Sequence, residues 1–396
     1  GTIFKSTESM TLFGRRVFFL SPKPCDVLIF DECNSQYVRR VINNKYSIGI
    51  FNMRPEDIFF GMGVMVQFSK ELLKFSLEEV RKHHRGFLRG VIKQVYYIYL
   101  KACLESIKPK AVITFIDTSS VFGLLAKHCD NFPFIAIQNG SRLSYAALPD
   151  YNYYVPHYFC FGTHEQELFP KLGYRVDHYY PVGSLVASLH FLPREQVEEK
   201  YDLLIVSSWR GSSDYVQDVQ DTMRSMKIMD QLLTRYIKNH EIKAALIYRT
   251  MRDCEGWIIP EIGLSEEEYY QEIYGDSIKH IDNSDRNIFP LMQQSKMVIT
   301  CLSTAGIEAY GLGKKLLYCN FTGTDLYHQD IADKILTKNS EYTAFSEILD
   351  QILSMKQEEY LEEHKERMQY YMSFDAEKSV EARIEAKFDE IIENFR

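Results

Sequence analysis

The sequence lacks the features that mark several large classes of protein. No apolar run approaches the roughly 20 residues of a membrane-spanning helix, and the N-terminus has no signal-peptide pattern. The eight cysteines include no C-x-x-C pair, and several lie in apolar runs such as HYFCFG and VITC. We therefore expect reduced, mostly buried thiols in a cytoplasmic protein. Paired histidines at helical spacing are also missing, and the one H-x-E triplet, at 364–366, has no C-x-x-C pair to complete a ligand set, so we expect no metal.

Several nucleotide-binding and hydrolytic signatures are missing as well. The sequence contains no Walker loop, no G-x-G-x-x-G fingerprint and no G-x-S-x-G nucleophile elbow. It has no excess of positive charge, because the net charge is −8 at pH 7, and nucleic acid is therefore not expected as a partner. The apolar fraction of 45% and the charged fraction of 25% are those of a protein that is globular throughout.

The chain of 396 residues exceeds the usual size of one hydrophobic core, so two domains are expected. Short apolar runs alternate with helical patterns, which is typical of an α/β fold with parallel sheets covered by helices. The polar stretch HFLPREQVEEKY at 190–201 separates the two halves. It predicts a Rossmann-like N-terminal domain over residues 1–195, a second domain over 196–375 and a C-terminal helix over 376–396 that packs back across the domains. Ligands in such folds bind in the cleft, at loops that follow strands.

One candidate ligand site follows the strand in VITCLSTAGIEA. Ser303 and Thr304 are N-cap candidates for a helix that begins where the strand ends. The backbone N–H groups and the positive dipole end of such a helix suit an anion. Gly306 would permit close approach of a ligand, and Glu308 in the first turn could accept ribose hydroxyls. An ordinary capped helix with a dipole-complementing glutamate explains the same residues equally well.

A second candidate is the turn in FIAIQNGSRLSY of the first half. The residues concerned follow a strand and comprise Gln138, Asn139, Gly140 and Arg142. Asn-Gly tolerates a left-handed backbone, so a tight turn is the simpler explanation. The functional alternative is a cleft loop that offers an amide and a guanidinium to a substrate.

The stretch FGTHEQEL follows the next strand-like run of the first half. Thr163 and Gln166 have the spacing of a capping box, which gives the segment a structural role. His164 and Glu165 lie between them, at the expected edge of the cleft. We regard both as candidates for a catalytic acid or base.

Polar and basic side chains also follow the strands of the second half. The serine pair and the arginine that follow LLIV, and the arginine that ends LIYR, suit an anionic ligand. A histidine in SIKHIDN could flank a base or a phosphate, with a turn as the alternative. These residues are Ser207, Ser208, Arg210, Arg249 and His280.

Several segments together resemble a bacterial enzyme family. They are AIQNGSR, FCFGTHEQELFPKLGY, PVGSL, LLIVSSWR, MDQLLTRYI and VITCLSTAGIEAYGLGKKLLY, within residues 110–320. The chain resembles the retaining β-Kdo transferase domains of lipopolysaccharide O-antigen and capsule assembly. The resemblance implies a GT-B-like fold with two Rossmann-like domains facing a central cleft. The first domain would be on the acceptor side and the second would bind the nucleotide sugar.

The resemblance also implies a reaction. It is the transfer of 3-deoxy-manno-octulosonate (Kdo) from CMP-β-Kdo to a sugar hydroxyl, with retention through a covalent enzyme intermediate. The segment MDQLL makes Asp230 the candidate nucleophile, with Asp214, Asp218 and Asp221 as competitors. His164, Glu165 or His280 would be the acid or base. CMP-Kdo would be the donor, with no other cofactor, and Ser303, Thr304 and Gly306 would face its phosphate or carboxylate.

The implied partners are a nucleotide sugar and a lipid-linked glycan acceptor, with peripheral contact at the inner face of the inner membrane. The first residue is Gly1, which suggests a domain of a longer protein with further glycosyltransferase domains. Other transferases or epimerases on the same scaffold, acting on CDP-glycerol, a pyruvyl donor or a UDP-sugar, remain alternatives. A non-catalytic glycan-binding module is another.

Overall fold

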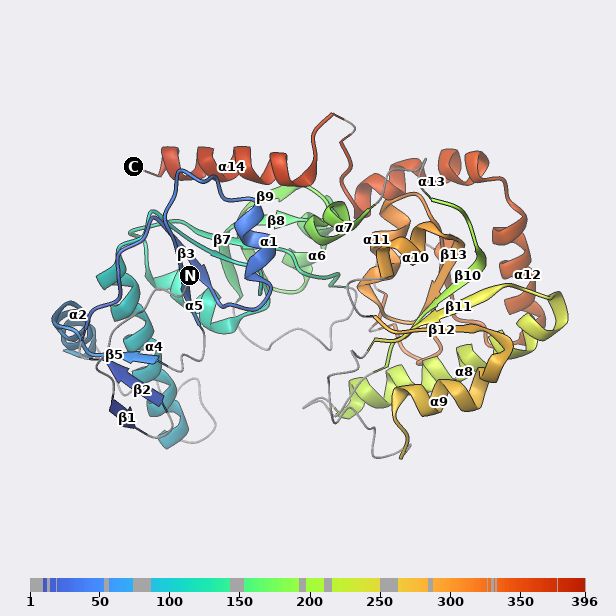
Figure 1. The fold of residues 1–396 in the computed structure, drawn as a ribbon, viewed down its shortest axis with the longest axis horizontal. Helices are drawn as coiled ribbons and strands as arrows, with labels where there is room; N and C mark the ends of the chain where they lie inside the picture. Colours follow the sequence, from blue (N-terminus) through green and yellow to red (C-terminus); the bar gives the residue numbers. More distant parts are fainter. Residues whose placement is uncertain are drawn as a thin grey trace.

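The fold is that of a computed structural model, shown in Figure 1. It describes residues 10–12, 15–18, 20–52, 57–73, 87–142, 153–191, 197–209, 216–249, 263–283, 288–325, 327–328, 331, 333–375 and 377–395. Two bodies lie side by side, and each is built on a parallel sheet with helices on its faces (Figure 1). The prediction of an α/β fold with two Rossmann-like domains is confirmed.

The N-terminal sheet has six parallel strands. In spatial order they are β4 (Ile48–Phe51), β3 (Val27–Phe30), β6 (Ala111–Thr114), β7 (Phe134–Ile137), β8 (Tyr154–Cys160) and β9 (Arg175–Pro181). The central strands β3, β6 and β7 are buried along their whole length, because helices cover both faces of the sheet, so they read as unbroken apolar runs. The helices of this body are α1 (Ser35–Arg40), α4 (Phe87–Ile107), α5 (Ser120–His128), α6 (His164–Lys171) and α7 (Leu185–His190).

A small sheet extends the N-terminal body. It consists of β1 (Met10–Leu12), β2 (Arg15–Phe18) and β5 (Asp57–Phe59). Helix α2 (Met62–Leu73) follows β5 directly and packs against α4. This sheet and α2 lie at the outer end of the body, away from the C-terminal half (Figure 1).

The C-terminal sheet also has six parallel strands. In spatial order they are β12 (Lys279–Ile281), β11 (Ala244–Ile247), β10 (Tyr201–Val206), β13 (Ser295–Thr300), β14 (Lys315–Cys319) and β15 (Leu336–Thr337). Its helices are α8 (Val216–His240), α9 (Glu266–Tyr274), η3 (Gly275–Ser277), α10 (Ile288–Gln293), α11 (Thr304–Gly311), η5 (Asp333–Ile335), α12 (Tyr342–Ser354) and α13 (Gln357–Tyr371). In each sheet the carboxyl ends of the strands lead into loops at one edge, and most candidate residues lie in these loops or in the helices that begin there.

The last helix, α14 (Val380–Asn394), lies on the N-terminal body, although α12 and α13 before it belong to the C-terminal one (Figure 1). The Arg383 guanidinium donates to the carbonyl oxygens of Pro181 at 2.6 Å and Val182 at 3.2 Å. Lys45 forms an ion pair with Asp389 at 2.8 Å. The chain therefore crosses between the bodies a second time after its first passage between β9 and β10.

Candidate functional site

Helix α11 begins at the carboxyl end of β13, as the sequence predicts. The N-cap residue Ser303 has an extended backbone, and its hydroxyl accepts a hydrogen bond from the Ala305 N–H at 3.3 Å. A Cβ atom on Gly306 would lie 2.5 Å from the Tyr318 hydroxyl oxygen. That hydroxyl in turn donates to the Ser303 carbonyl oxygen at 2.8 Å. In this structure Gly306 is therefore needed for packing against Tyr318, and we assign it no contact with a ligand.

The start of α11 meets the predicted cleft loop of the other domain. The Ser141 N–H donates to the Thr304 hydroxyl oxygen at 3.0 Å, which joins segments 163 residues apart. A Cβ atom on Gly140 would lie 3.1 Å from that hydroxyl and 3.4 Å from Nη1 of Arg142. A small residue at position 140 thus lets the loop and the helix approach. Two segments that the sequence identified separately form one site between the domains.

Asp117, which the sequence analysis missed, holds the cleft loop in place. It follows β6 and is 2% exposed. Its carboxylate forms an ion pair with the Arg142 guanidinium, and it accepts hydrogen bonds from the Tyr158 hydroxyl at 2.5 Å and the Asn139 N–H at 3.3 Å. Arg142 is thereby fixed beside the start of α11. The only available signal was the aspartate that ends the strand-like run AVITFID.

Gln138 and Glu165 lie buried beneath the same loop. The Gln138 amide donates to the Glu165 carboxylate at 2.9 Å and to the Gly140 carbonyl oxygen at 3.0 Å, and its oxygen accepts from the Phe161 N–H at 2.7 Å. Burial raises the pKa of Glu165 to about 7, although these hydrogen bonds oppose the shift. A carboxyl group with such a pKa can hold or release a proton near neutral pH.

His164 points elsewhere. Its ring lies 5.3 Å from the Tyr370 ring and 5.0 Å from the Tyr371 ring, both on α13, and its side chain is buried. Of the two neighbouring candidates, only Glu165 belongs to the network under the cleft loop.

Glu308 makes a second bridge between the domains. Its carboxylate accepts a hydrogen bond from the Ser184 hydroxyl at 2.6 Å, and Ser184 also caps α7 by accepting from the Ala187 N–H at 3.2 Å. Glu308 is largely buried. A ribose bound to Glu308, as the sequence predicts, would have to share or replace the contact with Ser184.

No protein-family model matches the chain, and no curated protein matches it. Solved structures, in contrast, do match the chain. The wall teichoic acid polymerase TagF, in a variant soaked with CDPG for 30 minutes, covers 94% of this chain and 90% of its own at 10% identity, with a TM-score of 0.51. Another TagF structure has the same coverage at 12% identity and a TM-score of 0.50. A putative UDP-N-acetylglucosamine 2-epimerase from Listeria monocytogenes covers 94% of this chain and 97% of its own at 12% identity, with a TM-score of 0.49.

The chain has the GT-B fold. At identities this low the similarity concerns the fold alone. The GT-B fold accounts for the two six-stranded parallel sheets.

In the C-terminal half of the GT-B fold, the described side chains predicted at the strand exits form hydrogen bonds with other groups of the protein. The Ser207 hydroxyl donates to the Glu266 carboxylate at 2.5 Å, which also accepts from the Arg249 N–H at 2.8 Å. The Arg249 guanidinium donates to the Trp209 carbonyl oxygen at 2.8 Å. Glu266 thus ties the exits of β10 and β11 together, and the sequence analysis did not identify it.

The remaining residues of that group also have protein partners or lie outside the described part. The Ser208 hydroxyl lies 3.1 Å from the Thr300 hydroxyl and accepts from the Leu302 N–H at 3.1 Å. The His280 ring nitrogens lie 2.9 Å from the Tyr248 hydroxyl and 2.8 Å from the Gly275 carbonyl oxygen. Arg210 and Asp214 lie outside the described residues, as does the side chain of Asp218.

Asp230, the candidate nucleophile, lies in the core of the C-terminal domain. It is 0% exposed on α8, and its two carboxylate oxygens accept hydrogen bonds from the hydroxyls of Tyr274 at 2.7 Å and Tyr269 at 2.9 Å. Burial raises its pKa to about 7, and the two tyrosine bonds only partly oppose the shift. In this conformation the carboxyl reaches no solvent, so the geometry favours a structural role. Its competitor Asp221 is also buried and accepts from the Tyr327 hydroxyl at 3.1 Å.

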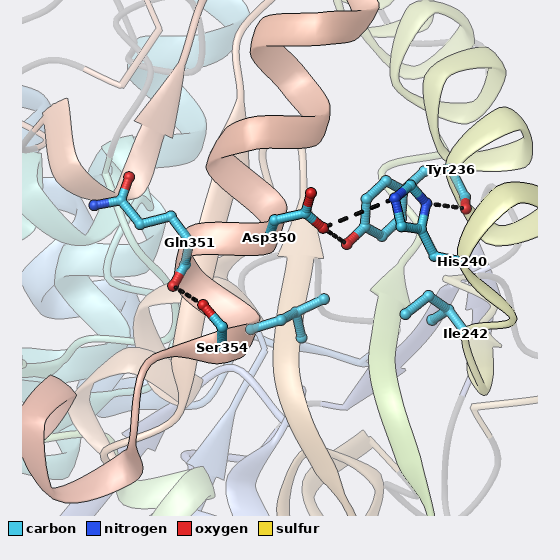
Figure 2. A pocket seen from close by; sticks show the side chains of 7 residues that line it. Tyr236, His240, Ile242, Asp350, Gln351 and Ser354 are labelled. Atoms are coloured by element: carbon cyan, nitrogen blue, oxygen red, sulfur yellow. Dashed lines mark hydrogen bonds and ion pairs between the residues drawn. The ribbon is translucent and has the colours of Figure 1, made fainter.

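A surface groove in the C-terminal domain lies apart from these loops (Figure 2). It runs between the end of α8 and α12, where the Tyr236 hydroxyl donates to the Asp350 carboxylate at 2.6 Å and the Tyr236 and His240 rings stack at 4.2 Å. Its other lining residues are Ile242, Gln351, Leu353 and Ser354. It shares no residue with the site between the domains.

Among the described residues, no group of three or more His, Cys, Asp or Glu side chains is arranged to hold a metal ion. No helix described here has the length and hydropathy needed to span a bilayer.

Proposed function

We propose that the protein is a retaining glycosyltransferase that moves Kdo from CMP-β-Kdo to a sugar hydroxyl of a lipid-linked bacterial glycan. The observation that carries the proposal is the meeting of the α11 N-terminus with the Gln138–Arg142 loop across the domains. The choice of Kdo and of CMP rests on the sequence resemblance. The enzyme would work in the cytoplasm at the inner face of the inner membrane.

The chemistry of the donor suits these two elements. Its phosphate would accept hydrogen bonds from backbone N–H groups at the start of α11, where the helix dipole is positive. The Kdo carboxylate would pair with Arg142, whose planar guanidinium suits a carboxylate. Because the Ser141 N–H now bonds to Thr304, a donor bound here would replace that contact. The proposed binding step therefore includes a slight separation of the loop from the helix.

Transfer with retention requires two displacements at the anomeric carbon. In the first, a carboxylate oxygen bonds to that carbon and the CMP phosphate leaves with the electron pair. In the second, the acceptor hydroxyl oxygen bonds to the carbon, the carboxylate leaves, and the hydroxyl proton passes to a base. Glu165 is our candidate for the base, since the sequence places it at the cleft edge and its pKa of about 7 suits proton transfer. Its carboxyl is buried and accepts from Gln138, so this role requires the cleft loop to open. The sequence resemblance alone supports Asp230 as the proposed nucleophile. Its burial in this structure favours a structural role instead.

Calorimetry with CMP, CDP, UMP and UDP tests the nucleotide part of the proposal. We expect CMP to bind and UMP and UDP to bind at least about tenfold more weakly. Thr304→Val should weaken CMP binding, because it removes a hydroxyl from the start of α11. Thr343→Val, an exposed threonine on α12, is the matched control and should bind CMP as the wild type does. Equal binding of CMP by both variants would place the nucleotide elsewhere.

A second candidate is a transferase that uses CDP-glycerol. A TagF structure with a similar fold was soaked with CDPG, and the same phosphate site would suit a CDP-linked donor. Tight binding of CDP-glycerol together with weak binding of CMP would favour this alternative. Nucleotide binding without any turnover of CMP-Kdo, CDP-glycerol or UDP-sugars would instead indicate a binding module.

A further inference from the structure

Two buried aromatic side chains hold the turn that joins β13 to α11, residues 301–303. Nε2 of His328 donates a hydrogen bond to the Cys301 carbonyl oxygen. The Tyr318 hydroxyl donates to the Ser303 carbonyl oxygen at 2.8 Å. The two rings also pack on each other, with 4.8 Å between their centroids, and both side chains are buried. Both carbonyl oxygens of the turn are therefore directed into the protein.

The direction of these carbonyl oxygens matters for an anion. A carbonyl oxygen carries a negative partial charge and repels a phosphate, whereas the N–H groups at the start of a helix attract one. Because the Cys301 and Ser303 oxygens are bonded to buried side chains, they are kept away from the proposed phosphate. The Leu302 N–H between them is fixed as well, since it donates to the Ser208 hydroxyl oxygen at 3.1 Å. These contacts set the direction in which the start of α11 points.

His328 acts here as a neutral donor. A carbonyl oxygen can only accept a hydrogen bond, so the ring proton lies on Nε2. Burial lowers the pKa of His328 to about 4, so its ring carries no charge at neutral pH. The side chain therefore contributes a hydrogen bond to the turn and no positive charge to a phosphate.

The position of His328 costs free energy. Its backbone has a φ of +57°, in the left-handed region that residues other than glycine rarely adopt. Within the part of the chain that the structure describes, its Nδ1 atom is buried and has no hydrogen-bond partner. Strained backbone and unpaired buried atoms of this kind concentrate where function requires them. Both features indicate that His328 has a role beyond packing.

Helix α8 fixes the loop that carries His328. This loop follows β14, and the Asn320 amide spans it by donating to the carbonyl oxygens of Thr324 at 3.1 Å and Tyr327 at 3.4 Å. The Tyr327 hydroxyl donates to the Asp221 carboxylate of α8 at 3.1 Å. The loop is thus anchored at the residue directly before His328, which holds the ring against the turn.

We propose that His328 is a positioning residue of the nucleotide site. Together with Tyr318 it holds the turn between β13 and α11, so that the start of α11 faces the donor phosphate. This inference rests on the proposed function, because it takes the start of α11 as the phosphate site.

Calorimetry of the full chain with CMP, CDP and UDP tests the inference on the nucleotide that the wild type binds most tightly. His328→Phe keeps an aromatic ring beside Tyr318 but removes the donor, so it should weaken binding at least about tenfold. His328→Gln can place an amide N–H near the position of Nε2 and should recover most of the affinity. Since neither variant relieves the strained backbone, the comparison isolates the hydrogen bond. His240→Phe, in the groove apart from the site, is the matched control and should bind as the wild type does.

Hydrogen exchange followed by mass spectrometry examines the turn itself, without any nucleotide. Peptides that cover residues 301–306 should exchange faster in His328→Phe and in Tyr318→Phe than in the wild type, because each variant loses one hydrogen bond to the turn. Peptides from β10 should exchange at the same rate in all three proteins, which shows that the variants are folded. Tyr318→Phe removes a single hydroxyl group and should also weaken nucleotide binding.

Three results would overturn the inference. They are nucleotide binding by His328→Phe and Tyr318→Phe as tight as that of the wild type, binding by His328→Gln no tighter than by His328→Phe, and exchange at residues 301–306 that neither substitution changes. Failure of the proposed function gives a different pattern. A wild type that binds none of the three nucleotides would overturn the proposed function and this inference together, and faster exchange in the variants would then show that His328 and Tyr318 hold the turn for packing alone.

Discussion

Replacing Asp230 with asparagine should change how the stability of the C-terminal domain depends on pH. The folded carboxyl has a pKa of about 7 because it is buried, whereas an unfolded aspartate has a pKa of about 3.9. The unfolded chain therefore releases this proton at lower pH than the folded protein. The stability that the protonated carboxyl contributes is present at low pH and is lost as the pH rises through about 7.

The size of the effect follows from the two pKa values. At about 1.4 kcal/mol per pH unit below the folded pKa, the wild type should lose about 2 to 3 kcal/mol between pH 5 and pH 8 through this group. Asparagine has no such proton, so the Asp230→Asn variant should gain that much in stability relative to the wild type over the same range. The comparison between the two proteins isolates this group from the other titrating residues.

Tryptophan fluorescence during urea unfolding is the assay. Both tryptophans of the chain belong to the second half, and Trp209 is buried with its ring 5.4 Å from that of Tyr269, a partner of Asp230. The signal therefore reports on the C-terminal domain. Asp276→Asn, at an exposed position, is the matched control and should follow the wild type at every pH. A constant difference in unfolding free energy between wild type and Asp230→Asn from pH 5 to pH 8 would refute the argument.

Three further substitutions test the site between the domains. Gly306→Ala should lower the free energy of unfolding by about 1 to 3 kcal/mol, because its Cβ atom would meet the Tyr318 hydroxyl at 2.5 Å. Thermal unfolding measures the loss of stability, and an unchanged melting temperature would contradict the packing. Asp117→Asn should lower donor turnover at least about tenfold without unfolding the protein, because Arg142 loses its charged partner. Unchanged turnover would show that Arg142 does not act on the donor. If Glu165 is the base, wild-type turnover should rise with pH through about 7. Glu165→Gln should remove both that rise and most of the activity. A rise with pH that survives the substitution would assign the base to another group.

Most strands were predictable because burial leaves a direct trace in the sequence. Strands β3 (VLIF) and β6 (AVIT) are buried on both faces and therefore consist of apolar residues, apart from Thr114 at the end of β6. Strand β9 (Arg175–Pro181) was not predicted, because it lies at the edge of its sheet and mixes polar and apolar residues, none of them buried. Its pairing with β8 is a tertiary contact that the segment itself does not reveal.

The candidate site was predictable in its parts but not in its contacts. The helix start at Ser303 and the turn at Gly140 have local signals, namely a capping residue after a strand and an Asn-Gly pair. That Thr304 bonds to the loop of the other domain depends on how the domains meet, which no local pattern contains. Asp117 was overlooked because its partners come from another strand and from the loop itself.

The same limit explains the position of Asp230. Asp230 is close to a buried apolar stripe of α8, in which Met226 and Met229 are fully buried. The sequence did not show that Tyr269 and Tyr274 of α9 would enclose its carboxyl. An acidic residue beside an apolar stripe is compatible with either a solvated or a buried position, and only the packing of the next helix decides between them.

The transfer reaction itself is the most direct test of the central claim. Phosphorus NMR of wild-type protein with enzymatically generated CMP-Kdo and a bacterial lipid-linked glycan fraction follows the formation of CMP over time. The account predicts that CMP appears faster than without protein, that Kdo enters the glycan in the β configuration, and that Thr304→Val slows both while Thr343→Val does not. CMP formation no faster than the background rate, together with turnover of CDP-glycerol or a UDP-sugar by the same protein, would contradict it.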